Sequence, residues 1–178
     1  AFARARADGA GASTAAFADV TGILQRLDRA FTALARNADK RFESDIAPNL
    51  RLRMDSADLE EVLGNLLDNA LKYARAQFLI AAWRDGDTAL MVRISDDGPG
   101  IAEADIARAI GSGQRLDTLQ PGTGLGLAIA SDLVHAYGGK ITLSRSDTLG
   151  GLCVTVSFPL AVAPTLASDG IGSAVASE

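Results

Sequence analysis

Several residue types and patterns are scarce in this chain of 178 residues, and each absence narrows what the chain can be. The one cysteine, Cys153, allows no disulfide within the chain, which suits a reducing compartment, and its apolar neighbours predict a buried core position. No apolar run reaches the ~18 residues of a membrane-spanning helix. The net charge of −5 argues against non-specific binding to nucleic acid.

What remains fits one compact domain, with 48% apolar residues to fill a core. Residues 1–16 are expected to be the end of an upstream helix and a linker, because basic residues precede Gly9 and Gly11. Residues 161–178 lack hydrophobic periodicity and are expected to form a flexible tail. We therefore expect a folded domain at residues 17–160, taken from a longer protein.

Hydrophobic periodicity predicts how this domain begins. Apolar residues at helical spacing predict a helix over residues 17–38, from Phe17 to beyond Leu34. Two short alternating segments, 41–46 and 50–54, predict strands on either side of a Pro48–Asn49 turn.

The second half of the domain is predicted to contain two hairpins and two helices. The first hairpin spans residues 77–95 across an Asp-Gly-Asp turn, and a small helix follows near 103–110. A helix from residue 125, stopped by Gly138–Gly139, precedes a last hairpin over residues 140–160. This order predicts an α+β two-layer sandwich, with helices on one face of a mixed sheet.

The segment EVLGNLLDNALKY, Glu61 to Tyr73, is predicted to be a helix with two unlike sides. One side gathers the apolar residues Leu59, Val62, Leu63, Leu66, Leu67, Ala70 and Leu71. The other side gathers Glu61, Asn65, Asp68 and Lys72, with Asn69 and Tyr73 at its edge. Asparagine is a poor helix-interior residue, so two of them at i, i+4 stand out. The polar side is either a solvated face or a row of oxygen ligands and a cation lining a groove.

Two glycine-rich segments follow this helix. In SDDGPGI, Asp96 ends a strand, and Gly98 and Gly100 would let the backbone approach a flat ligand closely. In PGTGLGLAI, alternate glycines open a helix, whose first amides and positive dipole end suit phosphates. Each segment by itself is also compatible with an ordinary turn. The second segment lacks the Gly-Lys-Ser/Thr of a Walker loop and the βαβ context of a Rossmann fingerprint.

The order of these segments is more specific than any one of them. An Asn-x-x-x-Asn helix, Asp-x-Gly-x-Gly after a strand and Gly-x-Gly-x-Gly opening a helix resemble the ATP-binding domain of histidine kinases. That domain belongs to the gyrase, Hsp90, histidine kinase and MutL superfamily. The resemblance covers about residues 40–160, and GSGQRLDTLQPGTGLGLAIA is similar to the short lid of the PhoQ group. It implies a Bergerat-type fold with a mainly antiparallel sheet.

The resemblance also implies roles for the residues of the first helix. Asn65 would hold Mg²⁺ through its amide oxygen, with Glu61 as a candidate for the outer coordination shell. Asn69 would act through its amide near the phosphates. Lys72 would face phosphate, and Tyr73 would pack along the nucleotide.

In the glycine segments, the resemblance implies that Asp96 accepts a hydrogen bond from the adenine amino group. Arg115, between the two segments, would be a second cation for the γ-phosphate. The other residues implied to admit the base or line the phosphates are Gly98, Gly100, Gly122, Thr123, Gly124, Leu125 and Gly126.

The chain departs from the family pattern in the lid. The usual phenylalanine box is missing, and Gln120 stands where the PhoQ group has a second arginine, so phosphate contacts would rest on Arg115 and Lys72. The one histidine, His135, is expected to face solvent beside Ser131 and Asp132, because the family's acceptor histidine lies upstream on a helical dimerisation domain.

Three functions therefore stand at this point. The first is transfer of the γ-phosphate of ATP to a histidine of that upstream domain, in a two-component sensor kinase. The second is ATP hydrolysis with Glu61 as the base. The third is a non-catalytic module that binds nucleotide to control association.

The first function implies several partners and a location. The phosphoacceptor domain would be the direct partner, a response regulator would be an indirect one, and no nucleic acid would be bound. The fragment itself would be a monomer and its parent a homodimer. The domain would lie in the cytoplasm, within an inner-membrane sensor protein.

Overall fold

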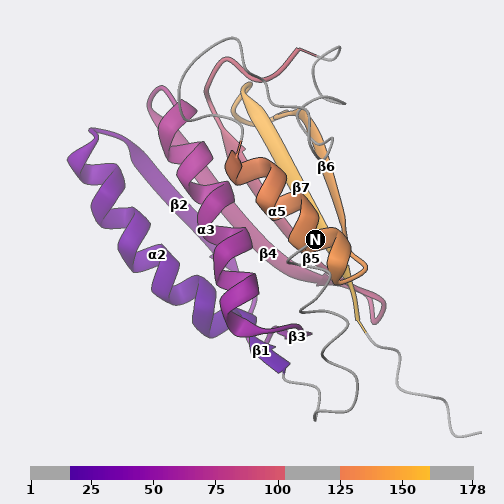
Figure 1. The fold of residues 1–178 in the computed structure, drawn as a ribbon. Helices are drawn as coiled ribbons and strands as arrows, with labels where there is room; N and C mark the ends of the chain where they lie inside the picture. The colour runs from indigo at the N-terminus through magenta and orange to yellow at the C-terminus, as the bar shows by residue number, and fades with distance from the viewer. Residues whose placement is uncertain (1–16, 103–124, 161–178) are drawn as a thin grey trace, which may run out of the picture.

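The computed structural model describes residues 17–102 and 125–160 (Figure 1). The helices are α2 (Val20–Asn37), α3 (Ser56–Tyr73) and α5 (Leu125–Ala136). The strands are β1 (Phe17–Asp19), β2 (Arg41–Ile46), β3 (Arg51–Arg53), β4 (Gln77–Asp85), β5 (Ala89–Asp96), β6 (Lys140–Arg145) and β7 (Leu152–Pro159). The expected helix near 103–110, the N-terminal linker and the C-terminal tail lie outside the described residues.

Five strands form the main sheet in the order β2-β4-β5-β7-β6. The β2–β4 pair is parallel, and the β4–β5, β5–β7 and β6–β7 pairs are antiparallel. The described helices α2, α3 and α5 lie together on one face of this sheet (Figure 1). The predicted two-layer sandwich with a mixed, mainly antiparallel sheet is therefore confirmed, as are both predicted hairpins.

The predicted helix at the start of the domain begins three residues too early. Residues 17–19 form the strand β1, paired with β3, and Phe17 is 58% exposed on it. Asp19 caps α2 by accepting a hydrogen bond from the Gly22 amide at 3.0 Å. The cap fixes the helix start at Val20. Leu34, predicted to belong to the apolar side, is also exposed.

The strands around the Pro48–Asn49 turn are present but belong to different sheets. The Thr21 hydroxyl donates to the Ala47 carbonyl at 3.0 Å and accepts from the Leu50 amide at 2.9 Å. Helix α2 thus holds both sides of the turn. On one side of the turn β2 pairs with β4, and on the other side β3 pairs with β1.

Helix α3 occupies the centre of the core. Its N-cap, Asp55, accepts hydrogen bonds from the Ala57 and Asp58 amides. The predicted apolar side is buried, apart from Leu71, which is half-buried. Cys153 is buried in β7, as its sequence context predicted.

A hydrogen bond to a buried carboxylate joins the start of α3 to the residue after α5. The Tyr137 hydroxyl donates to Asp58 Oδ2 at 2.6 Å, and the Asp58 side chain is almost fully buried. Burial and this bond to a carboxylate raise the pKa of Tyr137 from 10.0 to about 12. The contact holds the antiparallel helices α3 and α5 side by side.

We expect the Tyr137 phenol to titrate near pH 12 rather than 10. Because the folded pKa exceeds the unfolded one, this group stabilises the fold fully below pH 10, and that stability is lost between pH 10 and about 12. The chain has two tyrosines, so Tyr73→Phe leaves Tyr137 as the only phenol. Ultraviolet titration of that variant, with circular dichroism to follow folding, gives the value. Titration at pH 10 with the fold intact would contradict the hydrogen bond between Tyr137 and Asp58.

Candidate functional site

The polar edge of α3 presents the Asn65 side chain to the first turn of α5. Its Nδ2 donates to the Glu61 carbonyl oxygen at 2.9 Å, which fixes the orientation of the amide. A Cβ added to Gly126 would lie 3.1 Å from Asn65 Oδ1. The oxygen therefore faces the start of α5, and Gly126 leaves the space in front of it open. The prediction that a glycine segment opens a helix here is confirmed, since α5 begins at Leu125.

The last turn of α3 carries Lys72 and Tyr73. The Lys72 Nζ lies 5.4 Å from the centroid of the Tyr73 ring, a cation–π distance. The Tyr73 hydroxyl is buried and has no hydrogen-bond partner among the residues that the structure describes. A buried hydroxyl normally has a partner, so the Tyr73 hydroxyl can bond to a group outside the described residues. Asn69 lies half-buried one turn earlier.

Asp96 ends β5 as a buried carboxylate, 3% exposed. Its Oδ1 accepts from the Gly98 amide at 2.8 Å and from the Leu152 amide at 3.2 Å. Burial raises the pKa of Asp96, and the bonds from these two amides oppose that rise. Both amides bond to Oδ1, and neither bonds to Oδ2. The carboxylate can therefore offer Oδ2 to a donor from a ligand.

The loop after Asp96 is held closely between α3 and the turn before β7. A Cβ on Gly98 would come closer than 3.0 Å to the Tyr73 carbonyl oxygen. Gly100 has φ +74°, which favours glycine, and the space beside it is bounded by Gly151. Both predicted glycines are therefore required by the backbone.

The sequence reasoning missed Gly151. A Cβ there would come closer than 3.0 Å to the Asp96 carbonyl oxygen, Asp96 Oδ1 and the Gly98 amide nitrogen. Its amide also donates to the Asp96 carbonyl at 3.0 Å. The Gly150–Gly151 pair was a visible signal, but it reads as a hairpin turn in sequence. Only the packing of β7 against β5 brings Gly151 to the Asp96 loop.

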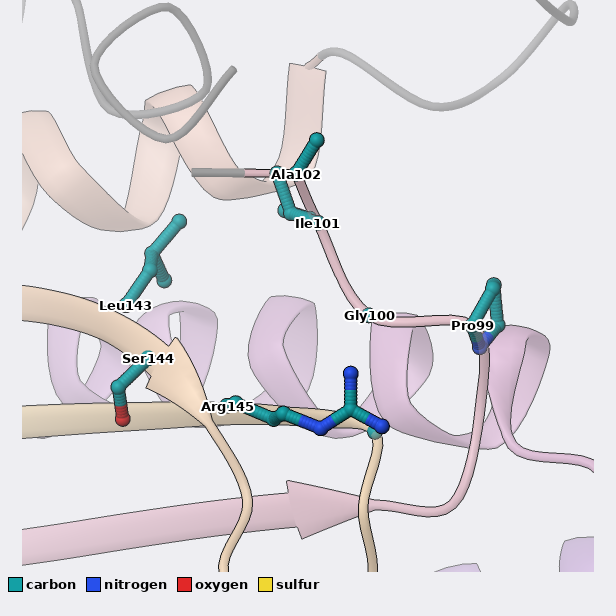
Figure 2. Close-up of a pocket in the computed structure, with 8 residues that line it drawn as sticks. Pro99, Gly100, Ile101, Ala102, Leu143, Ser144 and Arg145 are labelled. Atoms are coloured by element: carbon teal, nitrogen blue, oxygen red, sulfur yellow. The ribbon is translucent and has the colours of Figure 1, made fainter. Parts of the chain in front are cut away.

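A cavity of about 530 Å³ lies on one side of this loop (Figure 2). Its lining combines an apolar wall with the Arg145 side chain at the end of β6: Pro99, Gly100, Ile101, Ala102, Leu143, Ser144, Arg145 and Gly151. Figure 2 shows the Arg145 guanidinium directed toward the Gly100 side of the cavity. The loop therefore has open space on this side and depends on its other contacts for its position.

The remaining predicted site residues lie apart from this cluster or outside the described residues. Arg115, Gly122, Thr123 and Gly124 belong to the latter group. Glu61 is exposed one turn before Asn65. His135 is exposed, as predicted, with its Nδ1 3.4 Å from the buried Ser131 hydroxyl.

The site offers a carboxylate at one end and an amide oxygen with a lysine along α3. The described residues contain no cluster of His, Cys, Asp or Glu that could hold a metal ion by itself. Mg²⁺ needs few protein ligands when phosphate oxygens supply the others, and a single amide oxygen fits that chemistry.

Comparison with known proteins shows which family this domain belongs to. Residues 54–162 match the family described as histidine kinase-, DNA gyrase B- and HSP90-like ATPase. The chain belongs to this family. None of the described helices of this ATPase domain is long and apolar enough to cross a membrane.

The curated relatives of this ATPase domain include sensor kinases. This chain is 44% identical over 113 residues to the sensor protein kinase CarS of Pseudomonas aeruginosa, and the match covers 64% of this chain and 25% of CarS. It is 37% identical over 139 residues to the virulence sensor histidine kinase PhoQ of Salmonella typhimurium, covering 78% of this chain and 28% of PhoQ. The chain thus spans about a quarter of the length of these relatives.

Solved histidine kinase structures share the fold. The mycobacterial sensor histidine kinase MprB superposes with a TM-score of 0.70 at 24% identity, covering 81% of this chain and 97% of that one. Full-length ShkA, solved in complex with AMPPNP, superposes with a TM-score of 0.68 at 27% identity, covering 91% of this chain and 35% of ShkA. The predicted resemblance to histidine kinase ATP-binding domains is therefore confirmed.

Proposed function

We propose that this domain binds ATP with Mg²⁺ and donates the γ-phosphate to a histidine on an upstream domain of a two-component sensor kinase. The observation that carries the proposal is the buried Asp96 carboxylate, whose Oδ1 is hydrogen-bonded by two backbone amides. This arrangement leaves the other oxygen to accept from a ligand donor, which the adenine amino group would supply. The family match and the ATP analogue in the ShkA structure support a nucleotide as that ligand.

The nucleotide would lie between α3 and the glycine loops. Gly98, Gly100 and Gly151 let the loop, the end of α3 and the turn before β7 pack closely around Asp96, and this packing would set the place where the base approaches. The Tyr73 ring would pack along the nucleotide, and its buried hydroxyl would gain the partner that it lacks among the described residues. Lys72 would attract the phosphates, with Arg115 as the second cation.

Asn65 would hold Mg²⁺. Its amide nitrogen is engaged with the Glu61 carbonyl, so its oxygen is the atom left to face an ion. Bound Mg²⁺ would neutralise charge on the phosphate oxygens. Asn69 and the segment Gly122, Thr123, Gly124, Leu125 and Gly126, at the positive end of α5, would take the phosphates.

The rest of the proposal concerns the parent protein. A domain at residues 17–160 would present the phosphate to a dimerisation and phosphoacceptor domain of a homodimeric parent, which in turn serves a response regulator. Catalysis would be mainly positioning and charge neutralisation. The relatives are named sensor kinases, which supports a cytoplasmic position for this domain in a membrane-anchored sensor.

The test is transfer of radiolabelled γ-phosphate. We expect the chain to bind ATP but not to label itself, because His135 lies exposed late in α5, whereas the first turn of α5 faces Asn65. Adding the isolated phosphoacceptor domain of the parent should produce acid-labile phosphate on that domain. Asn65→Ala should reduce this transfer, and should weaken binding of ATP with Mg²⁺ more than binding of metal-free ATP. His135→Gln is the control and should behave as wild type.

Two results would contradict the proposal. Acid-labile phosphate on His135 of the isolated chain would place the acceptor within it. ATP hydrolysis at the same rate with and without the acceptor domain, and no transfer, would favour the hydrolytic alternative.

A further inference from the structure

The second aspartate of the SDDGPGI segment has a different set of contacts from Asp96. Asp97 Oδ1 accepts from the Arg75 amide at 2.7 Å and from the Ala76 amide at 3.1 Å, and Oδ2 also accepts from Ala76 at 3.0 Å. The Asp97 amide donates to the Gln77 carbonyl at 3.2 Å. These bonds tie the start of the glycine loop to the linker that leaves α3.

These contacts keep the Asp97 carboxylate ionised. Burial raises the pKa of Asp97, but the backbone hydrogen bonds at Ala76, Gln77 and Arg75 together hold it below its ordinary value. An ionised acceptor makes stronger hydrogen bonds to amides than a neutral one. At neutral pH the attachment therefore joins an ionised acceptor to the Arg75 and Ala76 amides.

A second charged side chain holds the same helix end from another direction. Lys40, just before β2, donates from Nζ to the Leu71 carbonyl at 2.6 Å. The last carbonyls of a helix have no partner within it, and a cation there also favours the negative end of the helix dipole. Lys40 thus holds the last turn of α3, and Asp97 holds the linker that follows it.

The position of that turn relative to the glycine loop matters for a ligand that touches both. Gly98 lies against the Tyr73 carbonyl so closely that no side chain fits between them. On its other side, the loop borders the cavity of Figure 2. Among the described residues, the loop is therefore positioned mainly by α3, its linker and the turn at Gly151.

We propose that Asp97 is a positioning residue of the nucleotide site, with Lys40 as its second support. It sets the distance between Asp96, which would take the base, and the end of α3, which carries Lys72 and Tyr73. The inference rests on the proposed function. A ligand that spans both ends gains affinity from a preset spacing, whereas a ligand that reaches only the Asp96 end gains little.

The experiment compares ATP with adenosine, which lacks the phosphates, by calorimetry and nuclear magnetic resonance titration. We expect Asp97→Ala to weaken ATP binding about tenfold more than adenosine binding. Asp97→Asn keeps an oxygen at the Oδ1 position that accepts from both amides, but it loses the charge and turns an N–H group toward the Ala76 amide. Its effect should therefore lie between those of wild type and Asp97→Ala. Lys40→Met should reproduce the Asp97→Ala pattern more weakly. Asp87→Ala, an exposed aspartate at the far end of the same hairpin, is the matched control.

The outcomes separate the two hypotheses. ATP and adenosine affinities that fall by the same factor, or asparagine and alanine variants that behave alike, would overturn the positioning role and leave the proposed function standing. A wild-type chain that does not bind ATP would overturn both. If Asp97→Ala does not fold, Lys40→Met decides, and an unchanged ATP-to-adenosine ratio in that variant would overturn the inference.

Discussion

Asp96→Asn is expected to weaken ATP binding by about 100-fold or more with the fold retained. The asparagine oxygen can replace Oδ1 and still accept from the Gly98 and Leu152 amides. Its amide nitrogen then replaces Oδ2, and an N–H group would meet the adenine amino group donor to donor. This variant is sharper than Asp96→Ala, which would also leave two amides without their acceptor.

Calorimetry with ATP, ADP and GTP measures the effect. Wild type should bind ATP and ADP well ahead of GTP, because guanine carries a carbonyl where adenine carries its amino group. The control is Asp87→Asn, the same chemical change at an exposed position, where Asp87 pairs with Arg84 at 3.3 Å. Equal affinity of wild type for GTP and ATP would remove the assigned role of Asp96.

The raised pKa of Asp96 adds a pH dependence with opposite signs for binding and stability. Adenine binding favours the ionised carboxylate, so ATP affinity should fall as the pH is lowered through the folded pKa. Without ligand, the folded state holds the proton more tightly than the unfolded state. The contribution of Asp96 to the free energy of unfolding is therefore full below its ordinary pKa of 3.8 and is lost as the pH rises through the folded pKa.

Gly151→Ala is the second change with a large expected effect. The new Cβ would meet the Asp96 carbonyl, the Asp96 carboxylate and the Gly98 amide at distances that real Cβ atoms do not show. These are backbone or hydrogen-bonded atoms, so the strand and the loop must separate. We expect a loss of about 1–3 kcal/mol in the free energy of unfolding, as for overpacked cores, and loss of measurable ATP binding. Urea unfolding and calorimetry give the two quantities.

Gly150→Ala is the matched control in the same turn. No atom lies within 4 Å of a Cβ there, but φ is +81°, so alanine should cost about 1–2 kcal/mol from backbone strain alone. Both variants are therefore destabilised, and only Gly151→Ala should lose ATP. If both bind ATP like wild type, Gly151 does not shape the site.

Local sequence patterns were enough to predict many of the helices and strands of this molecule. The two sides of α3 follow from helical periodicity, and the 77–95 and 140–160 hairpins follow from alternation around turn residues. The predicted start of the first helix was wrong because the spacing of Phe17 matches the helical period only by coincidence. Its pairing with Arg53 of β3 and the cap at Asp19 decide its conformation instead.

The sequence by itself determined the family, most of the order of elements after β1, and the residues Asn65, Asn69, Asp96, Gly98 and Gly100 as a candidate site. These features lie in short segments whose spacing is visible along the chain. Only the tertiary structure decided the contacts around them. Gly151 packs against Asp96, and hydrogen bonds join Asp97 to Arg75, Lys40 to Leu71 and Tyr137 to Asp58. Each contact joins residues more than 20 positions apart, as in the separation of 79 between Tyr137 and Asp58. No local periodicity encodes such a pair, because packing of one element on another, and not its own propensity, brings the two groups together.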